Sequence, residues 1–167
     1  MIEVRTDDLA FIAADAIARP VDAELRATTP IMRRLELAGG AGLAKHLRVN
    51  EPLAVGSAVV TPAGSLGIEL LIHGVVSSNT EPVSRASVRQ AVTSALQRAA
   101  DWGIAHLALP PFGIGAGNLD VEESAEVIAE AIRRHRQGAK YPTTITIVVE
   151  TAFEQDTFER VLTGVAT

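Results

Sequence analysis

A glycine-rich stretch, residues 113–118, is the part of the sequence best suited to hold an anion. Its alternating glycines permit positive φ angles and let the backbone approach a ligand closely. An apolar run at 104–109 precedes it, and Asp120 and Glu123 form a capping pattern that begins a helix. A loop between a strand and a helix N-terminus gathers backbone N–H groups that bind phosphate. The alternative is that the stretch is only a tight connection between the strand and the helix, in which glycine is needed because a side chain would not fit.

Charged side chains elsewhere in the chain are suited to related chemistry. Asp22 either activates a water molecule as a general base or caps the next helix. Arg19 and Arg26 carry planar guanidinium groups suited to phosphate, and both also fit as surface charges. The histidines have no metal-ligand spacing, and His73 and His106 lie in apolar strand contexts that indicate structural, hydrogen-bonded roles. No metal and no cofactor are expected.

Alternating strand and helix patterns form the framework that must position these residues. Strands are expected at 2–5, 13–18, 56–61, 68–76, 104–109 and 143–149, and helices at 31–37, 85–102, 121–135 and 153–162. Trp102, at the end of the second helix, is expected in the core. The alternation implies parallel pairing with right-handed crossovers, and a short turn near Pro62 implies one antiparallel pair. The sequence predicts an α/β fold, a three-layer α/β/α sandwich with a mixed central sheet, as one domain over residues 1–167.

Ligands of such sheets bind at the carboxyl ends of the strands. Three loops leave those ends in the expected order of elements, at residues 7–9, 19–29 and 113–118. We therefore expect one cleft, in which the glycine-rich stretch lies opposite Asp8 and the segment 19–22.

The composition excludes several classes of protein. The chain has 167 residues, of which 47% are apolar but only 4% aromatic, so its core must be built from Ala, Val, Ile and Leu. The net charge of −5 argues against broad electrostatic binding to nucleic acid. The lack of cysteine rules out disulfides and thiolate metal sites. No signal-peptide pattern and no apolar run of ~18 residues is present, so a cytoplasmic protein without membrane contact is expected.

Several short motifs, taken in their order along the chain, resemble the macro domain family. Residues 110–117, Pro-Pro-Phe-Gly-Ile-Gly-Ala-Gly, are similar to the family's Pro-Ala-x-Gly-Thr-Gly-x-x-Gly loop, which wraps the diphosphate of ADP-ribose. Residues 8–9, Asp-Leu, are similar to its Gly-Asp-Ile motif, whose aspartate accepts a hydrogen bond from the adenine amino group. Residues 15–17, Asp-Ala-Ile, and 72–73, Ile-His, also match family strands. The resemblance covers nearly the whole chain, which is identified as a divergent member.

The resemblance implies a site for ADP-ribose or a related nucleotide, either free or carried by an ADP-ribosylated protein. Asp22 stands where hydrolytic members have an asparagine that orients the distal ribose, which makes it the candidate catalytic residue. Arg19 is included among the expected ligand-binding residues because its guanidinium group is suited to phosphate. The full set is Asp8, Leu9, Arg19, Gly113, Ile114, Gly115, Ala116, Gly117 and Asn118.

The chain departs from the family pattern in places that bear on function. The family has Asn-Ala-Ala-Asn or Asn-Pro-Ala-Asn followed by glycines, whereas residues 19–22 are Arg-Pro-Val-Asp and residues 25–30 are Leu-Arg-Ala-Thr-Thr-Pro. Glu150 stands where an aromatic residue often lies near adenine, and Phe153 is the available substitute. We expect nucleotide binding with weak or no hydrolysis. The alternatives are an ADP-ribosyl hydrolase acting on an ester or phosphate, and a macro fold that has lost its ligand.

Overall fold

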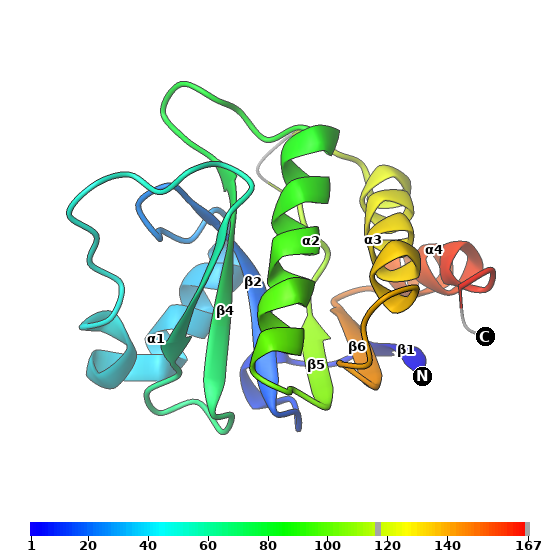
Figure 1. Cartoon of the computed structure of the whole chain (residues 1–167), viewed down its shortest axis with the longest axis horizontal. Coiled ribbons are helices and arrows are strands. Elements are labelled where there is room, and N and C mark those ends of the chain that lie inside the picture. Colours follow the sequence, from blue (N-terminus) through cyan, green and yellow to red (C-terminus); the bar gives the residue numbers. More distant parts are fainter. Residues whose placement is uncertain (116–117, 166–167) are drawn as a thin grey trace.

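A six-stranded central sheet organises the computed structural model, which describes residues 1–115 and 118–165 (Figure 1). The strands are β1 (Ile2–Thr6), β2 (Ala16–Asp22), β3 (Ala58–Pro62), β4 (Leu70–Ser77), β5 (His106–Leu109) and β6 (Thr144–Val149). Their order across the sheet is β1-β6-β5-β2-β4-β3; β3 and β4 are antiparallel, and the other neighbouring pairs are parallel. The prediction of a mixed sheet is confirmed.

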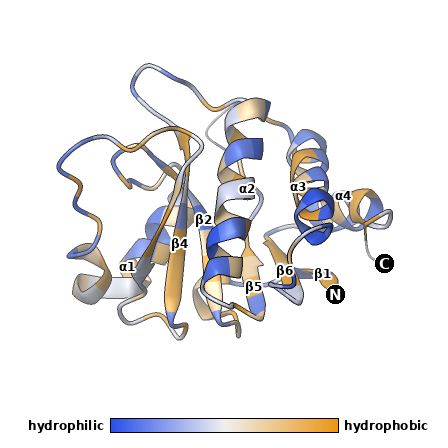
Figure 2. Cartoon of the chain, viewed as in Figure 1, coloured by the Kyte–Doolittle hydropathy of each residue, from blue (hydrophilic) through white to orange (hydrophobic). Residues whose placement is uncertain are grey.

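Helices cover both faces of this sheet. They are the 3-10 helix η1 (Leu9–Phe11) and the α-helices α1 (Pro30–Ala44), α2 (Arg85–Asp101), α3 (Val121–Arg136) and α4 (Ala152–Leu162). Ala16 and Ala18 of β2 pack in the core with α2, α3 and α4, whereas Ile17 between them packs with α1 and η1. In Figure 2 the strands are largely hydrophobic, while α2 and α3 carry hydrophilic stripes. The predicted three-layer α/β/α sandwich is confirmed.

The helix starts follow local capping signals. Ser84 caps α2 and Asp120 caps α3, each through a reciprocal capping box with the residue three positions on. These bonds involve neighbouring residues only, which is why the sequence predicts them correctly. As a result α3 begins directly after the glycine-rich stretch, with its N-terminus at the carboxyl end of the sheet.

Strand β2 extends further than the sequence predicts. The expected strand ends at residue 18, but β2 continues through Pro20 to Asp22. Proline lacks the N–H that a sheet interior requires. It is tolerated here because β5 pairs with β2 only at Ala16 and Ile17, so the later part of β2 has β4 as its paired neighbour. Arg19 therefore lies within the sheet and not in the expected loop.

Trp102 is not a core residue, and that prediction is wrong. The residue is 59% exposed, because α2 ends at Asp101 and Trp102 lies beyond Ala99, the last buried residue of the helix.

Within the described residues, no helix combines the length and the hydropathy required to cross a bilayer.

Candidate functional site

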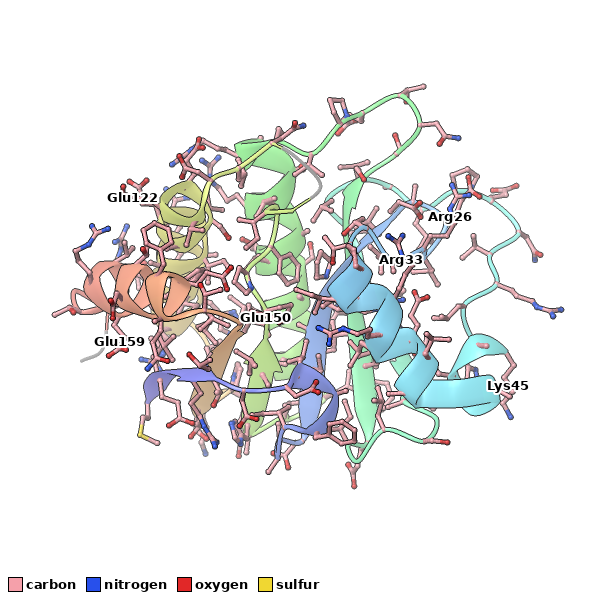
Figure 3. The ribbon with its side chains drawn as sticks, turned by 180° about the vertical axis from the view of Figure 1, so that it is seen from behind. Arg26, Arg33, Lys45, Glu122, Glu150 and Glu159 are labelled. Carbon is pink, nitrogen blue, oxygen red and sulfur yellow. The ribbon has the colours of Figure 1, made fainter. Side chains whose placement is uncertain are left out.

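A cavity of about 1120 Å³ lies at the carboxyl ends of β1, β2, β5 and β6. Four segments form its walls: the β1–η1 connection, the start of α1, the β5–α3 connection and the start of α4. Its lining includes Asp8, Leu9, Phe11, Thr29, Pro30, Ile31, Arg34, Ile114, Gly115, Glu150 and Phe153. Figure 3 shows this side of the molecule, with Glu150 between α1 and α4.

The cavity brings together expected site residues that are about a hundred positions apart in the sequence. Asp8 and Leu9 line it from one side, and Ile114 and Gly115 from another. The Asp8 Oδ1 atom accepts a hydrogen bond from the Ala10 amide at 3.0 Å, which begins η1. Gly115 has a φ of 81°, a conformation that favours glycine, and it can offer only backbone atoms to the cavity.

Gly113 and Asn118 of the glycine-rich stretch lie outside the cavity lining. Gly113 has a φ of 90°, and a Cβ atom there would lie 2.8 Å from Leu119 Cδ1 and 2.9 Å from Val88 Cγ2. The Asn118 side-chain amide donates a hydrogen bond to the Val83 carbonyl, which ties the stretch to the segment before α2. Glycine at position 113 thus serves packing, whereas Gly115 borders the cavity. Ala116 and Gly117 lie outside the described residues.

Arg19 is not presented to the cavity, and its interpretation as a surface charge is wrong. The side chain is fully buried. Its Nη1 donates to Glu36 Oε1 at 2.6 Å, its Nη2 to the Leu25 carbonyl at 3.2 Å, and its Nε to His73 Nδ1 at 2.9 Å. Alternation along β2 turns Arg19 to the same face as Ile17, where α1 supplies Glu36. The guanidinium therefore joins β2, α1 and the turn that follows β2.

The structural roles expected for His73 and His106 are confirmed. An arginine side chain only donates, so His73 Nδ1 accepts from Arg19 and the ring proton is on Nε2, 2.8 Å from Thr61 Oγ1. Burial, followed by the nearby Arg19 charge, holds the pKa of His73 well below its usual value. His106 pairs with Thr146 Oγ1 at 2.8 Å.

We expect acid pH to destabilise the protein through His73. The folded state keeps the ring neutral while the unfolded chain takes up a proton below a pKa of about 6.5. The free energy of unfolding therefore falls as pH drops below that value, by up to about 1.4 kcal/mol per pH unit from this residue. Denaturant unfolding of wild type and His73→Gln between about pH 7.5 and pH 5 measures the effect. Glutamine can retain both hydrogen bonds but does not titrate, so an equal pH dependence in the two proteins would contradict the expectation.

Asp22 ends β2 but does not belong to the cavity lining. Its Oδ1 accepts hydrogen bonds from the Glu24 and Arg26 amides at 2.8 and 2.9 Å, and its Oδ2 pairs with Arg26 Nε at 2.9 Å. These bonds organise a tight turn in which Leu25 has a φ of 62°. Asp22 does not cap the next helix, since Thr29 caps α1. Arg26 is exposed and pairs with acidic neighbours, so its role as a surface charge is confirmed.

The electrostatics of the cavity combine two opposing contributions. The N-termini of α1, α3 and α4 all border it, and each favours an anion. The lining also carries the carboxylates Asp7, Asp8, Asp120, Glu122, Glu150 and Glu154. Arg34, also in the lining, pairs with Glu150 at 2.9 Å. An anion is therefore favoured only where backbone amides, and not these carboxylates, face it.

Part of the cavity lining is not indicated by any motif of the sequence. Phe11 and Phe153 are 81% and 70% exposed, and both border the cavity, although only Phe153 was expected near a ligand. The feature of the sequence that could have indicated Phe11 is its aromatic ring close to Asp8 and Leu9, in a chain that has few aromatic residues. Ile31 belongs to the first turn of α1, whose orientation depends on packing. In the described part of the chain, no cluster of three or more potential metal ligands occurs.

The structure is similar to solved macrodomains. The Oceanobacillus iheyensis macrodomain with ADP aligns with a TM-score of 0.86 at 17% identity, covering 98% of this chain and 90% of that one. The Trypanosoma brucei macrodomain in complex with ADP aligns with a TM-score of 0.84 at 13% identity, covering 96% and 68%. At these identities the likeness shows a shared fold.

The sequence has relatives in bacteria and archaea. An uncharacterized protein of Mycobacterium tuberculosis is 30% identical over 138 residues, which are 83% of this chain, and the chain spans only 38% of that relative's length. An uncharacterized protein of Aeropyrum pernix is 30% identical over 151 residues, covering 89% of this chain and 78% of that protein. The family model for the Macro domain matches residues 19–128, more than half of the chain. The chain therefore belongs to the macro domain family.

Proposed function

We propose that this chain binds ADP-ribose or a related adenine nucleotide in the cavity, with weak or no hydrolysis. The observation that carries the proposal is the meeting of two segments, Asp8–Leu9 and Ile114–Gly115, on one cavity. These are the segments that resemble the family's adenine and diphosphate motifs. The Oceanobacillus and Trypanosoma neighbours, which share the fold, were solved with ADP. Residues 1–167 act as one macro-like domain in this proposal, and the nucleotide is free or attached to a protein.

In the proposed complex, the adenine lies at the Asp8 end of the cavity and the diphosphate lies at Gly115. The Asp8 carboxylate accepts a hydrogen bond from the adenine amino group. The exposed rings of Phe11 and Phe153 supply apolar surface on which a planar base can stack. Ile114 and Gly115 supply backbone to the phosphates.

Replacing Gly115 by alanine should weaken ADP-ribose binding. The residue has a φ of 81°, which strains any L side chain, and a Cβ there would lie 3.3 Å from Thr29 Cγ2. Both effects displace the backbone that is proposed to face the diphosphate. We expect a loss of about tenfold in affinity, equivalent to about 1.4 kcal/mol, in calorimetric titrations.

The matched control for Gly115→Ala is Gly138→Ala. Position 138 lies beyond the end of α3, and a Cβ there would meet nothing within 4 Å. This variant should bind as wild type does. Titrations of wild type with ADP-ribose, ADP and AMP test the proposal itself. If none of the three binds at about 1 mM, the chain is a macro fold that has lost its ligand.

Hydrolysis of an ADP-ribosylated substrate should be slow or undetectable. A general base must reach its proton at about 2.6–3.2 Å, directly or through one water. The Asp22 carboxylate is instead held by the Glu24 amide and by two donors of Arg26, away from the cavity lining. Turnover should be measured side by side for wild type, Asp22→Asn and Asp22→Ala. Robust wild-type turnover that disappears in both variants would make Asp22 the catalytic base and contradict the expectation.

A further inference from the structure

Thr29 and Gly115 lie against each other in the lining of the cavity. Both residues line the cavity, and a Cβ atom built on Gly115 would lie 3.3 Å from Thr29 Cγ2 and 4.0 Å from Thr29 Cβ. Carbon atoms in contact are about 3.5–4.0 Å apart, so a ligand atom between the methyl group and the glycine backbone would need about twice that spacing. The methyl group of Thr29 therefore covers Gly115 on the side where a Cβ atom would stand and leaves no layer for a ligand there, although Gly115 still borders the cavity.

The capping bond of α1 holds this methyl group in place. Thr29 is the N-cap of α1, and its Oγ1 accepts a hydrogen bond from the Met32 amide at 3.3 Å. The hydroxyl group is thereby turned to the helix, and the methyl group lies toward Gly115. The Met32 amide is taken by this bond, and Pro30 at the first helical position has no N–H to offer. The start of α1 thus presents a methyl group to Gly115 and contributes fewer phosphate donors than an ordinary helix N-terminus.

The turn before α1 is also folded upon itself. The Asp22 amide donates to the Arg26 carbonyl at 3.0 Å, and the Leu25 amide donates to the Asp22 carbonyl at 3.0 Å. The buried Arg19 donates to the Leu25 carbonyl at 3.2 Å and anchors the turn to the sheet. Asp22 lies outside the cavity lining, as does Asn118. The polar groups of this turn are therefore committed to hydrogen bonds within the protein.

We infer, on the basis of the proposed function, that Thr29 determines specificity and selects an adenine nucleotide that ends at its second phosphate. With the adenine near Asp8 and the diphosphate at Gly115, a nucleotide such as ADP fits between the two. The second ribose of ADP-ribose extends past Gly115, where it meets the Thr29 methyl group and must displace the capped start of α1. The cavity thus prefers ADP to ADP-ribose.

The test compares the dissociation constants of ADP and ADP-ribose by calorimetric titration. Wild type should bind ADP at least about tenfold more tightly than ADP-ribose. Thr29→Gly removes the side chain while keeping a residue that is accepted at an N-cap, and it should lower this preference by about tenfold. Thr29→Val replaces the hydroxyl group by a second methyl group and loses the capping bond. One of its two methyl groups can still lie against Gly115, so this variant should retain the preference despite a lower melting temperature. Neither substitution changes the charge of the cavity, so a shift in the ratio reports the steric effect.

Each outcome separates this inference from the proposed function. Wild type that binds ADP-ribose as tightly as ADP overturns the inference and leaves nucleotide binding intact, as does an unchanged ratio in Thr29→Gly. Wild type that binds neither nucleotide overturns both. The wild-type ratio alone decides the matter if Thr29→Gly fails to fold.

Discussion

Glu36→Met is expected to lower the free energy of unfolding by about 3–5 kcal/mol, because it leaves a buried charge without its partner. The Arg19 guanidinium is fully buried, and its Nη1 lies 2.6 Å from Glu36 Oε1. Burial lowers the pKa of Arg19, whereas the hydrogen bond and the charge of Glu36 raise it. An arginine does not lose its proton in a protein, so the variant must either bury an unpaired cation or open the structure around it.

The reverse substitution, Arg19→Met, should cost less. The Glu36 side chain is 25% exposed, so water can solvate its carboxylate once the arginine is gone. Methionine fills much of the volume that the arginine occupied. Denaturant unfolding of both variants measures the difference. The control is Glu122→Met, which removes an exposed pair with Arg160 and should cost less than about 1 kcal/mol. Equal losses in Glu36→Met and Glu122→Met would show that Arg19 is hydrated without Glu36.

Phe112→Ala should lower the free energy of unfolding by a similar amount, about 3–5 kcal/mol, through the cavity it leaves. Phe112 is fully buried at the base of the β5–α3 connection. Its ring packs so closely on β4 that a Cβ atom at Gly74 would lie 3.0 Å from Phe112 Cε2. Its carbonyl accepts a hydrogen bond from the buried Ser124 hydroxyl at 2.6 Å. The residue thus anchors the connection that leads to Ile114 and Gly115.

Phe153→Ala is the matched control, since it removes the same ring from an exposed position at the rim of the cavity. It should leave the unfolding free energy within about 0.5 kcal/mol of wild type, as is usual for surface substitutions. The variant should weaken binding of an adenine nucleotide if the ring stacks on the base. Should Phe112→Ala fail to fold, Phe112→Leu retains most of the apolar volume and should show a smaller loss of the same kind. A stable Phe112→Ala protein would contradict the anchoring role.

Local patterns were sufficient for most of the elements. The start of α3 depends on bonds between Asp120 and Glu123, and the start of α2 on bonds between Ser84 and Ser87, all within one helical turn. Alternating apolar residues determine which side chains of β6 face each layer of helices. The end of β2 is an exception, because the local pattern predicts that the strand stops before Pro20. The proline is tolerated there because β5 pairs with β2 only at Ala16 and Ile17.

The sequence by itself determined that this chain is a mixed α/β sandwich of the macro domain family, because motif order and periodicity are properties of the chain. Only the tertiary structure decided what individual polar residues do. Arg19 is a buried structural group because Glu36 reaches it from α1 and His73 from β4, 17 and 54 positions away. Gly113 packs on Val88 while Gly115 meets Thr29, although the two glycines are only two positions apart. Such contacts depend on how distant segments pack, and a local pattern carries no information about that packing.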